Sequence, residues 1–193
     1  GGWDDSNPAY TETKLTATDA AEDDRFGWSV AVDGDTVVVG ADGDDDNGGD
    51  HSGSAYAFHT TDGGVTFDEI KITADDAAAG DEFGYSVAID GGTVVVGTHQ
   101  YYDAGSSSGS AYVFLVTRTS SWPQLAKMVA GDAAALDYFG GSVAASGDLV
   151  AVGAHGDDGY TGSVYILQVD SSAAAYTQLV KLTADDATAG DNF

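Results

Sequence analysis

Aspartate is the residue type whose number and spacing in this sequence could do chemistry. One acidic segment recurs four times along the chain, as ATDAAEDDRF, ADDAAAGDEF, AGDAAALDYF and ADDATAGDNF. Its first recurring aspartates are Asp19, Asp76, Asp132 and Asp186, and its second are Asp24, Asp81, Asp137 and Asp191. Carboxylates on a loop are preferred ligands of Ca²⁺, so these segments are candidate calcium sites. Aspartates also form Asx turns with their own loop backbone, and recurrence in every copy favours that structural interpretation.

A second acidic group is uneven between the repeats. It contains five close-spaced residues, Asp44, Asp45, Asp46, Asn47 and Asp50, and its counterparts later in the chain are Asp103, Asp157 and Asp158. An uneven cluster is more typical of a dedicated site than a repeated one, although a solvated acidic loop is the alternative. The candidate Ca²⁺ ligands are therefore Asp44, Asp45, Asp46, Asn47, Asp50, Asp76, Asp81, Asp132, Asp137, Asp157 and Asp158.

Catalytic chemistry finds little support in the sequence. Cysteine is absent, which excludes disulfides, thiol catalysis and cysteine-based zinc sites. We identify no nucleophile elbow, no H-E-x-x-H pair and no phosphate loop, and we therefore expect no enzyme. His99 and His155 stand at equivalent positions, where the first repeat has Asp42. These three residues leave a small metal site open as a weaker alternative.

The charge balance limits the possible partners. The chain has 193 residues, with 32 acidic against 6 basic side chains and a formal net charge of -26. Nucleic acid is excluded as a partner because phosphate binding needs clustered lysine and arginine. We expect no direct membrane insertion, since no apolar run approaches the ~20 residues of a spanning helix. Cations, basic partners or a salty medium complement such a surface.

A repeat of nearly constant length predicts the elements that position the acids. Phe-Gly begins at Phe26, Phe83 and Phe139, and the next phenylalanine is Phe193, with spacings of 57, 56 and 54 residues. Each repeat has four strand signals, at residues 29–32, 37–39, 55–58 and 70–72 in the first copy. Asp33-Gly34 between the first two signals is typical of a tight hairpin. Four strands per repeat predict an all-β protein made of propeller blades. A parallel β-helix would need a shorter repeat.

These motifs resemble the FG-GAP repeat. The resemblance rests on Phe-Gly, on Val39-Gly40-Ala41 and Val152-Gly153-Ala154, and on the Gly-Ser-x-Tyr at residues 53–56, and it extends over about residues 14–193. Members of this family build the propeller of integrin α chains, and also occur in secreted proteins and in a phospholipase D. Many integrin-type repeats bind calcium between their first and second strands. Here that connection is the short Asp33-Gly34-Asp35, so that family site is not expected at this position.

The repeat pattern also predicts the organisation of the chain. We expect residues 1–25 to hold the last strand of a preceding blade and a connecting loop. Three complete four-stranded blades then follow at residues 26–82, 83–138 and 139–192, and residue 193 begins another. All belong to one propeller domain whose ring this chain does not close, so further blades from the same or another chain are expected partners. The opening Gly1-Gly2-Trp3 favours a piece of a longer precursor.

The function that these features favour is recognition or adhesion outside the cell or at its surface. A protein or a glycan would bind the acidic loop face, where the loop tyrosines Tyr101, Tyr102 and Tyr160 are candidate ligand contacts. Two alternatives stay open, namely a structural repeat of an extracellular filament or matrix and an accessory propeller of a larger secreted hydrolase. The equivalent lysines Lys14, Lys71, Lys127 and Lys181 are interpreted as protection of an outer strand edge.

Overall fold

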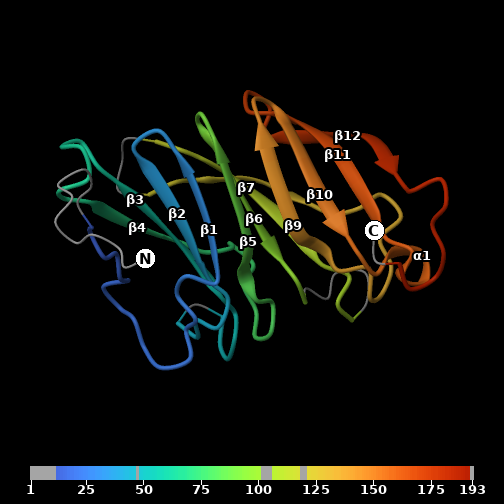
Figure 1. Cartoon of the computed structure of the whole chain (residues 1–193), viewed down its shortest axis with the longest axis horizontal. Helices are drawn as coiled ribbons and strands as arrows, with labels where there is room; N and C mark the ends of the chain where they lie inside the picture. Colours follow the sequence, from blue (N-terminus) through green and yellow to red (C-terminus); the bar gives the residue numbers. More distant parts are fainter. Residues whose placement is uncertain (1–11, 47, 101–105, 118–120, 192–193) are drawn as a thin grey trace, which may run out of the picture.

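The chain folds into three four-stranded antiparallel sheets, which confirms the all-β prediction (Figure 1). The computed structural model describes residues 12–46, 48–100, 106–117 and 121–191. Blade 1 contains β1 (Ser29–Asp33), β2 (Thr36–Ala41), β3 (Ser54–His59) and β4 (Asp68–Ile72). Blade 2 contains β5 (Phe83–Asp90), β6 (Thr93–Thr98), β7 (Ser110–Leu115) and β8 (Gln124–Met128). Blade 3 contains β9 (Phe139–Ser146), β10 (Leu149–Ala154), β11 (Ser163–Asp170) and β12 (Ala175–Leu182).

Helix is limited, among the described residues, to the four-residue α1 (Asp157–Tyr160) between β10 and β11. Within the same ranges, no helix is both long and apolar enough to cross a membrane.

The second strand of each blade shows how the sequence pattern becomes structure. β2 pairs with β1 on one side and with β3 on the other, and its Val38 and Val39 are both buried. An unbroken apolar run suits this position because both faces of the strand are covered by neighbouring sheets or loops. The hairpin predicted before it is formed, with Asp33 opposite Thr36 and with Gly34 at φ 54. Tight two-residue turns need a residue that tolerates positive φ, which explains the glycine.

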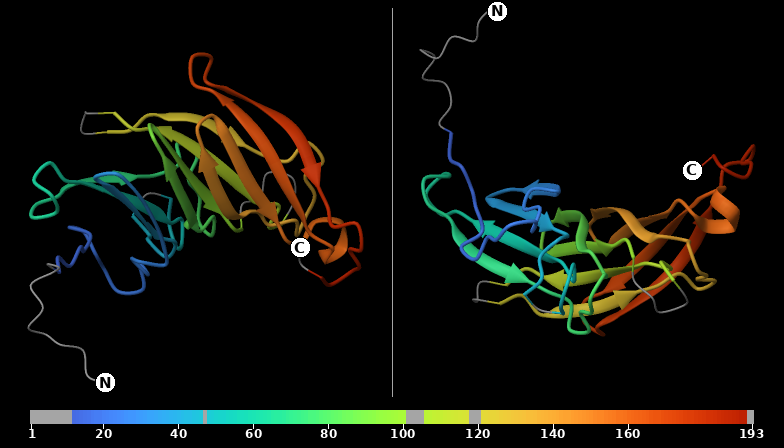
Figure 2. Two further views of the ribbon diagram at one scale, coloured as in Figure 1. Left: turned by 45° about the horizontal axis from the view of Figure 1, so that its top comes forward. Right: turned by 90° about the horizontal axis from the view of Figure 1, so that it is seen from below.

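The blades pack face to face in chain order, as both views of Figure 2 show. Each joint has a phenylalanine from a Phe-Gly pair at its centre. Phe83 and Phe139 are both 0% exposed, and their rings meet Tyr112 and Tyr165 edge to face at centroid distances of 5.5 and 5.4 Å. Edge-to-face aromatic pairs add to the stabilisation from burial. The phenylalanine of each of these Phe-Gly pairs therefore packs in the core between its own blade and the preceding one.

Polar contacts set the register of the same joints. The Ser29 hydroxyl donates to the carbonyl of Gly84 at 2.7 Å, and the Ser86 hydroxyl donates to the carbonyl of Gly140, also at 2.7 Å. At the other end of the strands, the Asp33 carboxylate accepts the backbone N–H of Gly91 at 2.7 Å. Inter-blade contacts therefore repeat with the same atoms at successive joints.

The segment before blade 1 differs from the prediction. Residues 12–25 contain no strand, although Leu15 and Ala17 pack against Tyr56 and Phe58. A fourth strand hydrogen-bonds to the third strand of its own blade, and no described strand is available to this segment. Residues 12–17 therefore pack on blade 1 in the way that the end of β4 packs on blade 2, but they form no strand hydrogen bonds. Within the described residues, the three sheets do not close into a ring.

Candidate functional site

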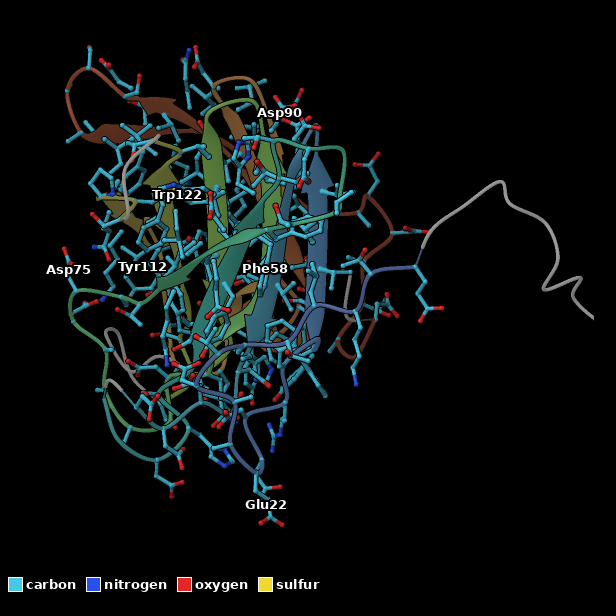
Figure 3. All side chains as sticks on the ribbon, turned by 90° about the vertical axis from the view of Figure 1, so that its left-hand side faces the viewer. Glu22, Phe58, Asp75, Asp90, Tyr112 and Trp122 are labelled. Carbon is cyan, nitrogen blue, oxygen red and sulfur yellow. The ribbon has the colours of Figure 1, made fainter. Side chains whose placement is uncertain are left out.

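The acidic loops gather at one end of the blades. Figure 3 shows Glu22, from the first acidic segment, at the opposite end from Asp90 in the β5–β6 turn. The β2–β3 loop lies along the next acidic segment, because Gly80 N–H donates to Asp50 O at 2.9 Å and Glu82 N–H donates to His51 O at 3.0 Å. The two kinds of acidic loop therefore form one surface, which we call the acidic end.

A lysine lies at the centre of the acidic group of blade 1. The Nζ of Lys71 on β4 is 2.7 Å from Asp19, 2.8 Å from Asp44 and 2.9 Å from Asp46. The hydroxyl of Tyr56 on β3 lies 2.9 Å from Asp19 and 2.6 Å from Asp44, and the ammonium lies 5.4 Å from its ring centre. Three carboxylates that could bind a free metal ion therefore bind the ammonium group of a lysine side chain instead. We call this arrangement the lysine latch.

The same latch recurs in the other blades. In blade 3, Lys181 Nζ is 2.8 Å from Asp132, 2.6 Å from Asp157 and 3.2 Å from Asp158. The Tyr165 hydroxyl is 2.8 Å from Asp132 and 3.3 Å from Asp157. In blade 2, Asp76 is bound in the same way by Tyr112 and Lys127. Five predicted calcium ligands are therefore engaged by lysine in blades 1 and 3, namely Asp44, Asp46, Asp132, Asp157 and Asp158.

The electrostatics of the latch favour its charged form. Burial raises the pKa of the Asp44 carboxyl, but hydrogen bonds from Lys71 and Tyr56 outweigh this effect and hold the pKa below its usual value. Burial likewise raises the pKa of Tyr56, and the hydrogen bond to Asp44 raises it further. Burial lowers the pKa of Lys71, but its carboxylate partners raise it more, so the ammonium stays charged. The latch is an ion pair at neutral pH.

Each of these lysines thus has a function that the edge-protection interpretation missed. The Lys71 and Lys181 side chains are each 22% exposed, and the Lys127 side chain is 20% exposed. Lysine folds back over a tyrosine ring because its aliphatic stem covers apolar surface while its ammonium reaches the acids. No short sequence motif could reveal these contacts, because a lysine and its carboxylate partner lie up to 52 residues apart in the chain.

We expect Lys71→Met to lower the free energy of unfolding by about 1–2 kcal/mol, because it leaves the buried Asp44 carboxylate without its cation. The loss should fade in acid. The depressed pKa of Asp44 means that its stabilising contribution is present above the ordinary carboxyl pKa and disappears as the pH falls through the folded value. Urea unfolding of both proteins at neutral and acid pH measures the difference. Lys14→Met is the matched control, because Lys14 is exposed and forms no ion pair within the described residues.

The second recurring aspartates stabilise their own loops. The Asp81 carboxylate accepts the N–H of Ala78 at 2.8 Å, and the Asp137 carboxylate accepts the N–H of Ala134 at 2.6 Å. Asp24 and Asp191 accept the N–H three residues before them in the same way. Asp81 and Asp137 are 3% and 4% exposed, so these carboxylates hold the loop backbone instead of facing solvent. The structural interpretation therefore fits these four residues in that each binds its own loop backbone, although an Asx turn would instead bind the N–H two residues later.

Among the described residues, two groups of side chains have ligand atoms close enough to share a metal ion. One is Asp19, Asp44 and Asp46, which already hold Lys71. The other is Asp45, Asp50 and His51 in the β2–β3 loop of blade 1, where Asp45 and Asp50 are exposed. Asp45 also accepts the N–H of His51 at 2.8 Å, which closes the loop on itself. Asn47, predicted to join this set, lies outside the described residues.

His99 and His155 belong to a stack of aromatic rings, and neither is part of a metal-binding group among the described residues. His99 and His155 have parallel rings 5.9 Å apart, and Tyr138 stacks on both, at 4.7 and 4.8 Å. Tyr85 extends the stack from the other side of His99, at 4.3 Å. Burial, together with the charge of His99, lowers the pKa of His155, so its ring is neutral at physiological pH. The stack joins blades 2 and 3 at the acidic end.

Asp42 and the loop tyrosines are the remaining residues that the sequence suggested as site residues. Asp42, proposed beside these histidines, is buried and paired with Arg25 at 3.4 Å. Tyr160 is 37% exposed and lies 6.4 Å from Tyr138, so it is accessible at the edge of the acidic end. Tyr101 and Tyr102 lie outside the described residues.

One segment does have the spacing of a nucleophile elbow, contrary to the expectation that the sequence holds none. Residues 105–109 have a G-x-S-x-G spacing, with Ser107 at its centre and at φ 59. The equivalent residues His51 and Tyr160 have φ 54 and 67, so this backbone conformation belongs to the repeat. A strand, and not a helix, follows the serine, so the segment lacks the strand–turn–helix context of a nucleophile elbow.

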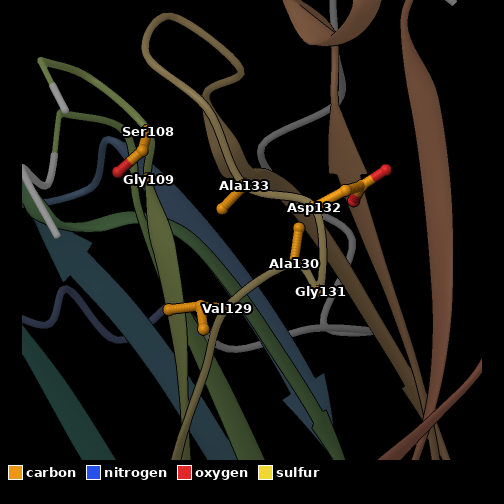
Figure 4. Close-up of a pocket in the computed structure, with 7 residues that line it drawn as sticks. All are labelled: Ser108, Gly109, Val129, Ala130, Gly131, Asp132 and Ala133. Atoms are coloured by element: carbon orange, nitrogen blue, oxygen red, sulfur yellow. The ribbon is translucent and has the colours of Figure 1, made fainter. Parts of the chain in front are cut away.

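A cavity of about 410 Å³ beside the acidic end offers no additional chemistry (Figure 4). Small side chains line it, including Ala130 and Ala133. Figure 4 shows the Asp132 carboxylate pointing away from Ser108 and Val129, and its partners are Tyr165 and Lys181. Among the described residues that line the cavity, no charged group is aimed into it that could orient a substrate.

Three four-stranded antiparallel sheets, joined in chain order by repeated loops, define a β-propeller-type repeat protein. The FG-GAP repeat profile matches residues 10–58, 66–114 and 122–167. The chain belongs to the FG-GAP repeat family, as its motifs indicated. A search of curated proteins found no match.

Proposed function

We propose that this protein is a non-enzymatic recognition module, located outside the cell or at its surface, whose acidic end binds cations and basic partner surfaces. The observation that carries the proposal is the convergence of two sets of acidic loops on one end of the blades. The formal charge of -26 makes that end attractive to basic proteins and to glycans bridged by cations. Tyr160 adds an exposed ring that can pack against such a partner.

Calcium binds, in this proposal, at the carboxylates of Asp45 and Asp50, which lie beside His51. This group has two exposed carboxylates and no lysine within it, whereas the space between Asp19, Asp44 and Asp46 is already occupied by the ammonium group of Lys71. Backbone carbonyls of the same loop would complete the oxygen ligands that Ca²⁺ needs. With only two carboxylates, we expect weak affinity, in the range of about 10⁻⁴ to 10⁻³ M that extracellular modules show.

We expect calorimetric titration with CaCl₂ to give one weak site in the wild-type protein and a higher melting temperature in its presence. Asp50→Asn should abolish both effects, because it removes one of the two carboxylates. Asp185→Asn removes an equal charge from another acidic loop and should leave binding unchanged. Equal binding by the two variants would show that the ion atmosphere of the acidic end, and not a defined site, attracts calcium.

The same proteins test recognition. A fluorescent oligolysine peptide should bind the wild-type protein at low salt, lose affinity steeply as salt is added, and be released by calcium. Asp45→Asn combined with Asp50→Asn should weaken peptide binding more than Asp185→Asn does. Failure of the peptide to bind at low salt would contradict the recognition proposal even if calcium binds.

A further inference from the structure

A second cavity, of about 660 Å³, lies between blades 1 and 2 and away from the acidic end. Its lining comes from the β1–β2 turn, the end of β3 and the start of β4 in blade 1, and from the β7–β8 connection in blade 2. Figure 3 shows Trp122, from that connection, in the half of the blades that contains Asp90, with Glu22 at the opposite end. A volume of this size suits a small organic ligand, since such sites measure about 300–1,000 Å³. We call it the joint cavity.

A row of three polar side chains forms the blade 1 side of the joint cavity. Thr36 on β2 is opposite His59 on β3, and His59 is opposite Asp68 on β4. All three line the cavity, and the Thr36 hydroxyl lies 3.1 Å from Nδ1 of His59. Two residues further along their strands, Ala57 and Ile70 pack in the core between blades 1 and 2. Because strand side chains alternate with a period of two, the polar row lies on the same face of the sheet, toward blade 2.

The polar row belongs to blade 1 and is not part of the repeat. At the position of His59, blade 2 has Leu115, which is opposite Thr93, and blade 3 has Gln168, which is opposite Leu149. Leu115 shows that the blade architecture accepts an apolar side chain at this place. The row is therefore not required for folding, and a ligand is the physical reason that remains for it.

The charge of the lining determines the sign of the ligand. Asp35 and Asp68 both line the joint cavity, and no lysine or arginine is among its lining residues. Within the described residues, neither carboxylate accepts a side-chain or backbone hydrogen bond or forms an ion pair, and His59 does not bond to Asp68. Carboxylates in a partly enclosed space attract cations and repel anions. The ligand should therefore carry a positive charge.

The opposite wall of the joint cavity is apolar, which favours an organic cation over a metal ion. Val116 and Trp122 of blade 2 form this wall, together with Ile70 of blade 1. The Trp122 ring is held in place, because its Nε1–H donates to the carbonyl of Thr117 at 3.0 Å. Asp35, His59 and Asp68 do not form one of the groups whose ligand atoms are close enough to share a metal ion. An apolar wall facing two separated carboxylates suits a ligand with a charged head and an apolar body.

We propose that the joint cavity binds a small organic cation that has a primary ammonium head and an apolar, preferably aromatic, body. The ammonium group donates hydrogen bonds to the Asp68 and Asp35 carboxylates, and the Thr36–His59 pair lies beside it. The apolar body packs against Val116 and Trp122, where an aromatic ring also attracts positive charge. This site is separate from the acidic end and takes a ligand that the acidic end does not select by shape.

Three probes with one body and different heads test the proposal, namely phenethylamine, phenethyl alcohol and phenylpropionate. They are titrated into the full chain at physiological salt, and binding is followed by the indole N–H peak of Trp122 in proton–nitrogen correlation spectra. The chain has three tryptophans, and Trp122→Phe identifies the peak by its loss. Phenethylamine, which is an ammonium ion at neutral pH, should shift this peak saturably. Phenethyl alcohol should bind about tenfold more weakly, and phenylpropionate should cause no shift.

Two matched variants separate a defined site from general attraction to an acidic protein. Asp68→Asn should weaken phenethylamine binding by about tenfold without changing the response to phenethyl alcohol. Asp148→Asn is the control, because Asp148 holds the place of Asp35 in the turn of blade 3, where its carbonyl accepts the N–H of Val169 as that of Asp35 accepts the N–H of Thr60. Asp68 and Asp148 are both exposed, so both variants should fold.

Four results would overturn the proposal. They are a Trp122 peak that phenethylamine does not move, equal binding of phenethylamine and phenethyl alcohol, a saturable shift with phenylpropionate, and equal weakening by Asp68→Asn and Asp148→Asn. Asp45→Asn combined with Asp50→Asn should leave phenethylamine binding unchanged. The outcome at the joint cavity is therefore independent of the calcium and peptide experiments at the acidic end.

Discussion

Replacing Phe83 by alanine should lower the free energy of unfolding by about 3–5 kcal/mol. The ring is 0% exposed and meets Tyr112 at 5.5 Å and Phe114 at 5.9 Å, so its removal leaves a cavity in the joint between blades 1 and 2. Because a domain of this kind has about 5–15 kcal/mol of stability in total, this one substitution removes a large part of it. Urea unfolding followed by tryptophan fluorescence measures the change.

Phe26→Ala is the matched control for Phe83→Ala. Phe26 makes the same pair of ring contacts, with Tyr56 at 5.5 Å and Phe58 at 5.8 Å, but it is only partly buried. We expect it to cost less than half as much, because water already reaches part of the ring. Equal losses at the two positions would show that Phe83 acts through its own blade and that the joint adds nothing.

A second large loss is expected for Gly97→Ala, at about 3 kcal/mol. A methyl group at Gly97 would collide with the backbone carbonyl of Gly140 in the neighbouring blade and with the Ser86 hydroxyl that binds this carbonyl. Because the obstacle is backbone, the two blades must separate to make room. Thermal unfolding by circular dichroism, with urea titration for the free energy, measures the effect.

Gly153→Ala separates this collision from any general effect of glycine replacement. Gly153 has the same place in its blade, but the only group that would be crowded is the Ser142 side chain, which can rotate away. We expect a loss of about 1 kcal/mol or less. A loss at Gly153 as large as that at Gly97 would mean that these glycines serve strand conformation and not the close approach of blades.

The repeats made the fold predictable to the level of individual strands. Phe-Gly spacing, the Asp-Gly hairpin and the apolar second strand each depend on neighbours in the sequence, and all three appear as expected. Residues 12–25 were less predictable, because their sequence resembles β4 but the strand that would pair with it is not available. A strand-like sequence pattern therefore predicts a strand only where a neighbouring strand is available to pair with it.

The candidate site was predictable in composition and not in pairing. The sequence located the acids on two loops at one end, but it could not show that Lys71 lies within 3 Å of carboxylates from both. That contact depends on how a β4 side chain folds over Tyr56, which is decided by packing. The ring stack of His99, Tyr138 and His155 was likewise hidden, because its members come from two blades and from the segment between them.

The lysine latch has a consequence for the conditions that the protein tolerates. Proteins whose acidic loops are held together by dissolved calcium unravel there when the ion is diluted or chelated. In this chain, a lysine on the fourth strand of each blade (β4, β8 and β12) brings a permanent ammonium group to the loop carboxylates, and this group cannot diffuse away. The loop architecture should therefore persist in fresh or brackish surroundings and in EDTA, whether or not calcium binds at Asp45 and Asp50.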